Sequence, residues 1–328
     1  MKTFYSKVIS KYSPVFPILI GIILIYGYFL RAEVAFPTVV SQGQIDLWGR
    51  FGFSKNFILN HINGFYYLEF WLSMLSIIGA FYLGMSLIGK TSGLVITIFL
   101  GIYPYYVANV YSAETVAIFC FILFLFFQLQ ATVSYSRAFS ALSGVFFMLA
   151  LICNPACLIL GVIMYIYQAI TSRNIAVLYN FLLFLGGALV VYIIYTIFLV
   201  FFPNNAAFMP SLGETFAEFC RNFKIFIGSP LNYINNTIIP LFTDTLAHPA
   251  RYAGSLNSYT YWHYLAIFSS IFGFLYSFIE EKARILTILS IIVLLQAFFM
   301  KISFGLLFLF VIMVGSYLID KVFNDVFC

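Results

Sequence analysis

Charge is what this sequence has least of. Only 8% of its 328 residues are Asp, Glu, Lys or Arg, whereas 63% are hydrophobic and the mean hydropathy is +1.02. So few polar side chains cannot cover the surface of a water-soluble globule. The composition therefore argues against a soluble protein and predicts an all-α polytopic membrane protein, in which the bilayer is the solvent for most of the surface.

The motifs of several large protein classes are missing as well. The sequence contains no HExxH pair, P-loop, dinucleotide fingerprint or Ser/His/Asp signature, so a protease, an ATPase or a redox enzyme lacks support. The net charge of +5 includes no basic run, which argues against a nucleic-acid partner. The five cysteines imply no disulfide framework. Cys153 and Cys157 would share a helix face, but without further Cys or His partners they predict no metal site.

Long apolar runs are what the sequence has in abundance, and they predict about ten membrane spans. Each run has roughly 15 to 25 residues, the length that a spanning helix needs. The first run follows three lysines but precedes no small-residue cleavage site, so we interpret it as a retained span and not as a signal peptide. The predicted spans are 13–30, 66–88, 92–110, 114–131, 138–152, 156–171, 176–202, 263–279, 284–299 and 303–319.

With ten spans, the Lys and Arg residues of the short loops fall on one face, which the positive-inside rule makes cytoplasmic together with both termini. The chain is then a single transmembrane domain, 1–328, of a membrane that we take to be the bacterial inner membrane. The polar segments 31–65 and 203–262 become loops on the outer face. Residues 211–227 place four Phe residues at spacings of three and four, which predicts an amphipathic surface helix. Residues 42–53 predict another.

Several short motifs follow one another in the first half of the chain. A Gly-containing turn lies at 89–94, Tyr103-Pro104-Tyr105 ends the third predicted span, and Ala113-Glu114-Thr115 opens the fourth. A hairpin at 143–156 contains Asn154-Pro155. In this order the motifs resemble the GT-C superfamily of membrane glycosyltransferases, similar to the dolichyl-phosphate-mannose and aminoarabinose transferases.

The resemblance implies a function. It implies that the chain transfers a sugar from a polyprenyl-phosphate donor to an envelope glycan or lipid-linked acceptor on the non-cytoplasmic face. No cofactor is implied beyond the lipid-linked donor as substrate, and no divalent metal is indicated. The chain departs from the family pattern in three places: it has Ala32-Glu33 where Asp-Glu is usual, and Asn154 and Lys301 where Arg is usual.

Sugar transfer needs a carboxylate that accepts the proton of the acceptor hydroxyl, and cations that stabilise the departing phosphate. Glu33, just past the first span, is the predicted base, unless it is only a helix-end charge. Asp46 is the alternative base, unless it pairs with Arg50 one helical turn away. Arg31 is predicted to hold the lipid phosphate, although an Arg at the end of a span commonly reaches for the headgroups.

Other polar residues near the outer face complete the predicted substrate-binding set. Glu114 and Glu69 open predicted spans, where the helix dipole favours a carboxylate even without a function. The aromatic row around His263 fits either sugar stacking or the interfacial aromatic belt. Besides Arg31, the predicted substrate-binding residues are Arg50, Glu114, Arg221, Lys224, His248, Arg251, His263 and Lys301.

Three rival functions stay open. An O-antigen-polymerase-type enzyme would use the same chemistry to lengthen chains. A non-catalytic GT-C-like subunit would use the fold as a scaffold for a membrane protein partner. A transporter has less support, because the middles of the predicted spans carry almost no charges for an ion path.

Overall fold

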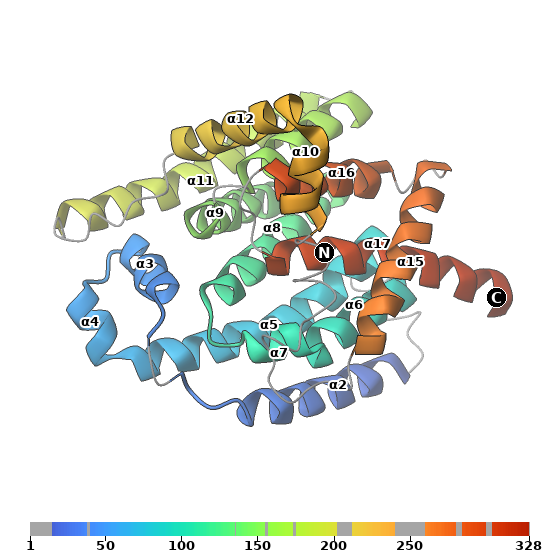
Figure 1. Ribbon diagram of the computed structural model, residues 1–328, viewed down its shortest axis with the longest axis horizontal. Coiled ribbons are helices and arrows are strands. Elements are labelled where there is room, and N and C mark those ends of the chain that lie inside the picture. Colours follow the sequence, from blue (N-terminus) through green and yellow to red (C-terminus); the bar gives the residue numbers. More distant parts are fainter. Residues whose placement is uncertain are drawn as a thin grey trace.

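The computed structural model describes residues 15–37, 40–134, 136–154, 157–172, 175–201, 212–239, 260–279, 284–299 and 304–327 (Figure 1). Over these residues the secondary structure is helical, without strands, which confirms the all-α prediction. The helices are α2 (Val15–Ala32), α3 (Gln42–Arg50), α4 (Lys55–Asn60), α5 (Ile62–Leu87), α6 (Lys90–Ile102), α7 (Pro104–Ala108), α8 (Ala113–Ser134), α9 (Arg137–Cys153), α10 (Cys157–Ser172), α11 (Ile175–Phe201), α12 (Leu212–Gly228), α13 (Pro230–Tyr233), the π-helix η1 (Ile234–Ile238), α15 (Thr260–Ile279), α16 (Arg284–Phe299) and α17 (Phe304–Phe327).

The prediction of ten membrane spans is wrong by the measure of helix length and composition. In the described part of the chain, three helices are long and apolar enough to cross a bilayer: Ile62–Leu87, Glu114–Ser134 and Leu178–Ile197. Other apolar stretches among the fully described residues are shorter, such as α6 with 13 residues. At 1.5 Å per residue such a helix rises only about 20 Å, less than a hydrocarbon core of about 30 Å. The structure thus describes an all-α membrane protein with fewer long spans than its apolar runs suggest.

Helix boundaries follow local chemistry. The side chain of Ser41 accepts a hydrogen bond from the backbone N–H of Gln44, and the Gln44 side chain reaches back to Ser41, which forms a capping box that starts α3. Ser54 caps α4 in the same way through the N–H of Phe57. Pro104 occupies the first turn of α7, where its missing N–H costs nothing. The sequence Tyr103-Pro104 therefore ends α6 and restarts the chain as a separate short helix.

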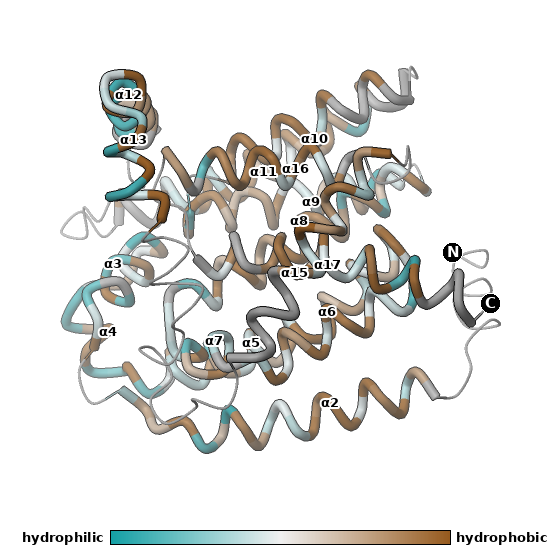
Figure 2. The backbone as a smooth tube through the Cα atoms, turned by 45° about the vertical axis from the view of Figure 1, so that its right-hand side comes forward, coloured by the Kyte–Doolittle hydropathy of each residue, from teal (hydrophilic) through white to brown (hydrophobic). Residues whose placement is uncertain are grey.

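Most of the long helices run side by side, and the polar segments gather at one end of this bundle (Figure 2). Here α2 and α6 end, α5 and α8 begin, and α3 packs against the end of α9. The start of α17 joins them, because Tyr106 donates a hydrogen bond to the carbonyl of Gly305 at 2.9 Å. We call this the α3 end of the bundle.

Small residues let the helices approach closely. A Cβ atom added to Gly93 of α6 would lie 2.7 Å from the carbonyl oxygen of Phe81 in α5. One added to Gly144 of α9 would lie 2.0 Å from the carbonyl oxygen of Phe184 in α11. Both distances are too short for any side chain, so the two crossings depend on glycine, as is common between helices in membranes.

At the opposite end of the bundle, α17 closes on α6. The carboxylate of Asp320, which is only 6% exposed, accepts a hydrogen bond from the backbone N–H of Ser92 at 3.2 Å. Ser92 also donates its hydroxyl to Ser316 at 2.6 Å. A carboxylate at a helix N-terminus satisfies unpaired N–H groups and interacts favourably with the helix dipole. The last helix of the chain thus caps one of the early ones.

Candidate functional site

Arg31 is buried at the α3 end. It is 1% exposed, and its guanidinium donates hydrogen bonds to Ser73 Oγ at 2.7 Å and to the carbonyl oxygens of Leu100 at 2.7 Å and Gly101 at 2.6 Å. A fourth bond reaches the carbonyl of Gly27 at 3.2 Å. These bonds tie α2 to α5 and α6. The structure therefore does not support the prediction that Arg31 holds a lipid phosphate, because its donors already serve the protein.

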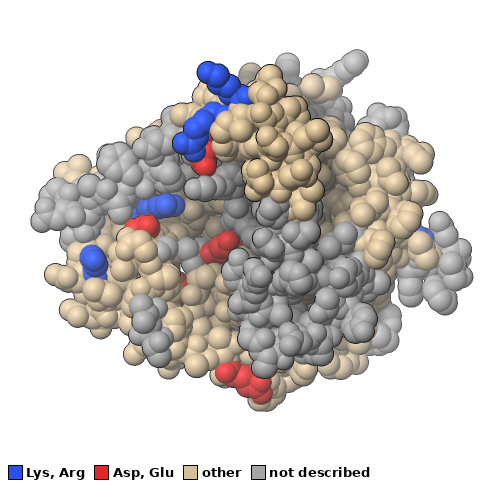
Figure 3. All heavy atoms as spheres, viewed as in Figure 1, with Lys and Arg blue, Asp and Glu red and all other residues tan. Residues whose placement is uncertain are grey.

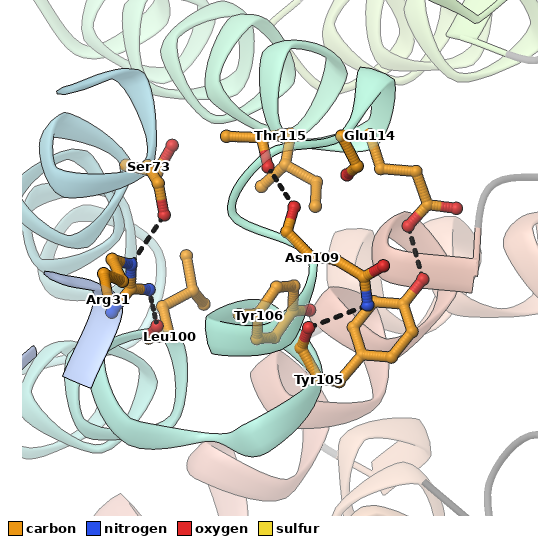
Figure 4. Close-up of a pocket in the computed structure, with 11 residues that line it drawn as sticks. Arg31, Ser73, Leu100, Tyr105, Tyr106, Asn109, Glu114 and Thr115 are labelled. Carbon is orange, nitrogen blue, oxygen red and sulfur yellow. Dashed lines mark hydrogen bonds between the residues drawn. The ribbon is translucent and has the colours of Figure 1, made fainter. Parts of the chain in front are cut away.

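A small polar cavity lies beside the guanidinium of Arg31 (Figure 4). Its volume is about 20 Å³, which is room for a water molecule but not for a sugar. In Figure 4, Arg31 and Ser73 lie on one side, Glu114 and Tyr105 lie on the other, and Tyr106, Asn109 and Thr115 lie between them. The cavity is lined by Arg31, Ser73, Ser76, Leu100, Tyr105, Tyr106, Asn109, Ser112, Glu114, Thr115 and Ile118.

Glu114 connects three helices across this cavity. Its carboxylate accepts the hydroxyl hydrogen of Tyr105 in α7 and the backbone N–H of Gly305 in α17, the latter at 3.3 Å. Neighbouring Tyr106 is buried, and burial together with the charge of Glu114 raises the pKa of its hydroxyl well above the ordinary value. Tyr106 therefore stays protonated and remains a donor. The polar partners of Glu114 belong to the protein, so a structural role accounts for it without a substrate.

A second buried cluster forms around Glu69, which is 0% exposed in the first part of α5. Its two carboxylate oxygens accept hydrogen bonds from Trp48 Nε1 at 3.0 Å and from Gln44 Nε2 at 3.2 Å. The same Gln44 amide donates to the carbonyl of Tyr111 at 3.0 Å. Both donors come from α3, so this cluster fastens α3 to the bundle. Trp48 is 5% exposed and packs on Phe65, so this side chain contacts the protein and not lipid, and the predicted surface position of residues 42–53 stays a prediction.

Glu33 lies outside these clusters. It is exposed, directly after the end of α2, and its backbone N–H still bonds to the carbonyl of Phe29 at 3.1 Å. Three residues further along the chain, Phe36 is stacked on Tyr66 with ring centroids 5.5 Å apart, and it meets the rings of Tyr67 and Tyr111 edge-on. Glu33 is thus an accessible carboxylate that precedes an aromatic group by three residues in the sequence. We call this group the Phe36 cluster (Phe36, Tyr66, Tyr67, Tyr111).

Tyr67 and Phe36 leave part of the Phe36 cluster open, with 58% and 36% of their side chains exposed. Burial, and to a smaller extent neighbouring Tyr67, raises the pKa of the Tyr111 hydroxyl above its ordinary value. Tyr111 is therefore a neutral hydrogen-bond donor near pH 7. Exposed faces of aromatic rings with hydroxyl groups at their edges suit the apolar face and the hydroxyls of a sugar.

Asp46 and Arg50 do not form the pair that their spacing predicts. Asp46 accepts a hydrogen bond from the side chain of Gln42 at 2.7 Å. Arg50 instead donates to the carbonyl oxygens of Ile152 at 3.3 Å and Cys153 at 3.0 Å, at the end of α9. A cation at a helix C-terminus satisfies unpaired carbonyls and stabilises the helix dipole. Arg50 therefore has a structural role that its sequence position does not reveal.

The remaining predicted cations are divided between the surface and the parts of the chain outside the described residues. Arg221 and Lys224 lie exposed on α12, with Arg221 3.9 Å from Glu218. His263 falls in the first turn of α15, where only the backbone is described. The other three, His248, Arg251 and Lys301, lie outside the described residues. The structure therefore leaves their predicted roles as predictions.

Charged side chains are sparse on the surface as well. On the face shown in Figure 3, most of the Lys, Arg, Asp and Glu side chains lie on the part of the molecule that carries α3, α4 and α12. The described residues contain no group of three or more His, Cys, Asp and Glu side chains placed to hold a metal ion. Glu33 offers an accessible carboxylate, which suits acid–base chemistry on a polar substrate.

Comparison with known proteins adds no family. No protein-family model matches the chain, and no curated protein matches it either. The resemblance to GT-C transferases therefore stands on the order of its motifs alone.

The site residues that the sequence reasoning missed are Gln44 and Trp48, together with the depth of Glu69. Glu69 has the signal of a charge within an apolar run, which is expensive in a membrane and tends to mark a site. Gln44 and Trp48 fall in the first polar segment, and nothing in their spacing indicates that both donors meet one carboxylate. Their partner lies 21 to 25 positions away along the chain.

Proposed function

We propose that this protein is a membrane glycosyltransferase that moves a sugar from a polyprenyl-phosphate donor to an envelope glycan or lipid-linked acceptor. The observation that supports the proposal best is the accessible carboxylate of Glu33, three residues before the partly open Phe36 cluster in the sequence, at the polar end of an apolar bundle. The GT-C-like order of motifs gives the reaction class. In this proposal the α3 end faces away from the cytoplasm of a bacterial inner membrane.

The proposed transfer step needs one base, which takes a proton from the acceptor, and one leaving group, the lipid phosphate. The acceptor hydroxyl gives its proton to Glu33 as its oxygen bonds to the anomeric carbon of the sugar, and the bond from that carbon to the phosphate oxygen breaks. The phosphate leaves with the electron pair, and another cation of the second outer segment, such as Arg251, would stabilise its charge. Arg31 takes no part in this step, because its donors bind the carbonyls of α2 and α6.

Glu33→Gln tests the assignment of the base. The variant keeps the size of the side chain but cannot accept the proton, so we expect transfer from purified lipid-linked sugar to fall by about 100-fold or more. Asp46→Asn is the matched control, because Asp46 is the other carboxylate of the outer segment and bonds to Gln42. Full activity of Glu33→Gln with a loss in Asp46→Asn would assign the base to Asp46. The length of the product separates a single-sugar transferase from an O-antigen-polymerase-type enzyme.

A non-catalytic scaffold is the second candidate, and one observation favours it. Arg31, Arg50, Glu69 and Glu114 all bond to other groups of the protein, and the cavity lined by Arg31 and Glu114 has no room for a sugar. A scaffold would need a membrane protein partner. Co-purification of one stable partner at fixed stoichiometry, together with no binding of lipid-linked sugar to the wild-type chain, would establish the scaffold and overturn the transferase.

A further inference from the structure

Helix α12 lies across the bundle and not along it. Figure 2 looks nearly along its axis, whereas α10 runs across the same view. The helix is attached to the end of α16 through Phe299, whose carbonyl accepts a hydrogen bond from Asn222 at 3.0 Å. The rings of Phe219 and Phe226 meet the Phe299 ring edge-on, each with centroids 5.6 Å away. One face of α12 is therefore fixed to the protein at a chain position where a membrane helix ends.

The next segment reinforces this attachment. Tyr233, at the end of α13, stacks on the Phe299 ring and donates its hydroxyl to the carbonyl of Phe298. Burial raises the pKa of this hydroxyl, so it remains protonated and keeps donating. Both ends of the α12–α13 segment are thus held by the last residues of α16. The orientation of α12 follows from several contacts and not from one.

A second face of α12 is apolar and uncovered. Phe216, Cys220, Phe223 and Ile227 follow one another at spacings of four, three and four, so they form one stripe along the helix. Phe216 is 65% exposed and Ile227 is 64% exposed, and Cys220 and Phe223 are exposed too. Phe223 lies at the border of this stripe, because its ring also meets the Phe299 ring edge-on with centroids 5.5 Å apart. Phe216, Cys220 and Ile227 lie away from the face formed by Phe219, Asn222 and Phe226, which contacts α16. We call the whole stripe the α12 stripe.

The charges of α12 lie to the side of the stripe. At 100° per residue, Lys224 and Arg221 are displaced from the centre of the stripe by roughly a quarter to a third of a turn. Both side chains are exposed, and long cationic side chains extend from an apolar surface toward phosphate groups. Glu218 lies on the far side of Arg221, 3.9 Å from it. The charged face also carries the exposed Ile225, but both cations of α12 lie there and the longer apolar stripe lies away from it. An apolar stripe with cations at its side is a feature of a helix that lies in the headgroup region.

We propose that α12 is an interfacial helix that inserts the α12 stripe into the bilayer surface and binds anionic phospholipid headgroups through Arg221 and Lys224. The occupant follows from the charges, because the cations match phosphate whereas a covering protein helix would be expected to bury the stripe and leave the cations to water. The position of α12 across the end of α16 gives it the orientation that the membrane surface requires. The inference does not depend on sugar transfer.

A nitroxide spin label on the natural Cys220 tests the depth of the stripe. The labelled protein is reconstituted in lipid nanodiscs and carries the substitutions Cys153→Ala and Cys328→Ser. A further variant with Cys220→Ser has no label at 220, so its signal measures the labelling of other sites. A second label at Ile225→Cys, in a Cys220→Ser chain, is the matched control. Residue 225 follows Arg221 by four and Glu218 by seven, so it belongs to the charged face. The measured quantity is the ratio of collision rates with oxygen, which enriches in the bilayer, and with a water-soluble nickel chelate.

We expect this ratio to be about tenfold higher at 220 than at 225, because the two labels would lie on opposite sides of an interfacial helix. Equal, chelate-accessible labels would overturn the proposal by placing α12 in water. A label at 220 shielded from both reagents would overturn it by placing a protein on the stripe.

The lipid charge is tested separately. Replacing phosphatidylcholine by a mixture with phosphatidylglycerol should raise the oxygen-to-chelate ratio at 220 by about twofold. The double variant Arg221→Gln/Lys224→Gln should remove that difference while leaving the label at 220 deeper than the one at 225. An unchanged response in the double variant would refute the headgroup contact. A chain that fails the glycosyl-transfer assay but passes both label tests would refute only the transferase proposal.

Discussion

Two arginines show how differently this chain uses its few charges. Arg31 is 1% exposed and donates four hydrogen bonds, to Ser73 and three backbone carbonyls, where α2 meets α5 and α6. Arg221 sits on α12 with 70% of its side chain exposed and only a long contact to Glu218. The Arg31 side chain holds helices of the protein together, whereas the Arg221 side chain is accessible from outside the protein. In a chain this apolar, a buried cation is therefore a poor guide to a substrate.

The largest effect should come from Arg31→Ala. Its removal leaves the carbonyls of Leu100 and Gly101 without a donor in an apolar interior, at a cost of about 3 kcal/mol or more in the free energy of unfolding. Denaturation of the detergent-solubilised protein by SDS, followed by intrinsic fluorescence, measures the change. Arg31→Lys should lower the free energy of unfolding by less, because the Lys ammonium still reaches some of these acceptors. Stability unchanged in Arg31→Ala would show that the comparison with Arg221 is mistaken.

Glu69→Ala should be next. It leaves the indole N–H of Trp48 and one N–H of the Gln44 amide without an acceptor beneath α3, a loss of about 2 kcal/mol. Hydrogen exchange should rise in residues 42–50 and stay unchanged in α12, since α12 makes no bond to this cluster. Glu69→Gln keeps an acceptor for one of the two donors and serves as the matched control. Equal exchange in the wild type and both variants would mean that the cluster does not hold α3.

Tyr105→Phe should have a smaller effect, about 1 kcal/mol, because it removes one hydrogen bond to Glu114 but leaves the Gly305 N–H and the ring in place. Thermal unfolding in detergent should show a small decrease. Tyr82→Phe, which alters an exposed hydroxyl on α5, is the control and should not change the melting temperature. A larger loss than that of Glu69→Ala would reverse the proposed order of the two clusters.

The smallest effect should come from Arg221→Ala. An exposed ion pair contributes little, so the free energy of unfolding should change by no more than about 0.5 kcal/mol. SDS denaturation under the conditions used for Arg31→Ala gives a direct comparison of the two arginines. A loss similar to that of Arg31→Ala would show that α12 contributes to folding through its charges and not only through Phe299.

The sequence predicts the helical architecture well because apolar runs and breakers are local signals. Tyr103-Pro104, Asn154 and the acidic residue at 114 fall at helix ends, and α12 (Leu212–Gly228) forms almost where the phenylalanine spacing predicts a helix. The predicted number of spans is wrong because an apolar run is only a local signal. An apolar run is counted as a span even where a turn divides it into helices too short to cross a bilayer, as at α6 and α7.

The candidate site is harder to predict because its contacts join distant parts of the chain. Arg31 meets Gly101 and Leu100 about seventy positions away, and Arg50 meets Cys153 across 103. Spacing along one helix favours Asp46 as the partner of Arg50, but the carbonyl end of α9 offers several acceptors with no carboxylate to desolvate. Only the tertiary arrangement decides between a neighbour on the same helix and an acceptor from another.

The contact of Asp320 with Ser92 has a consequence for how the protein is made. The N-terminus of α6 emerges from the ribosome long before residue 320, so it must enter the membrane without the carboxylate that later caps it. The same is true of Tyr106, whose acceptor is the carbonyl of Gly305. Until α17 arrives, these polar groups need water or an insertion factor. Synthesis of the last helix thus completes the first half of the molecule as well as the second.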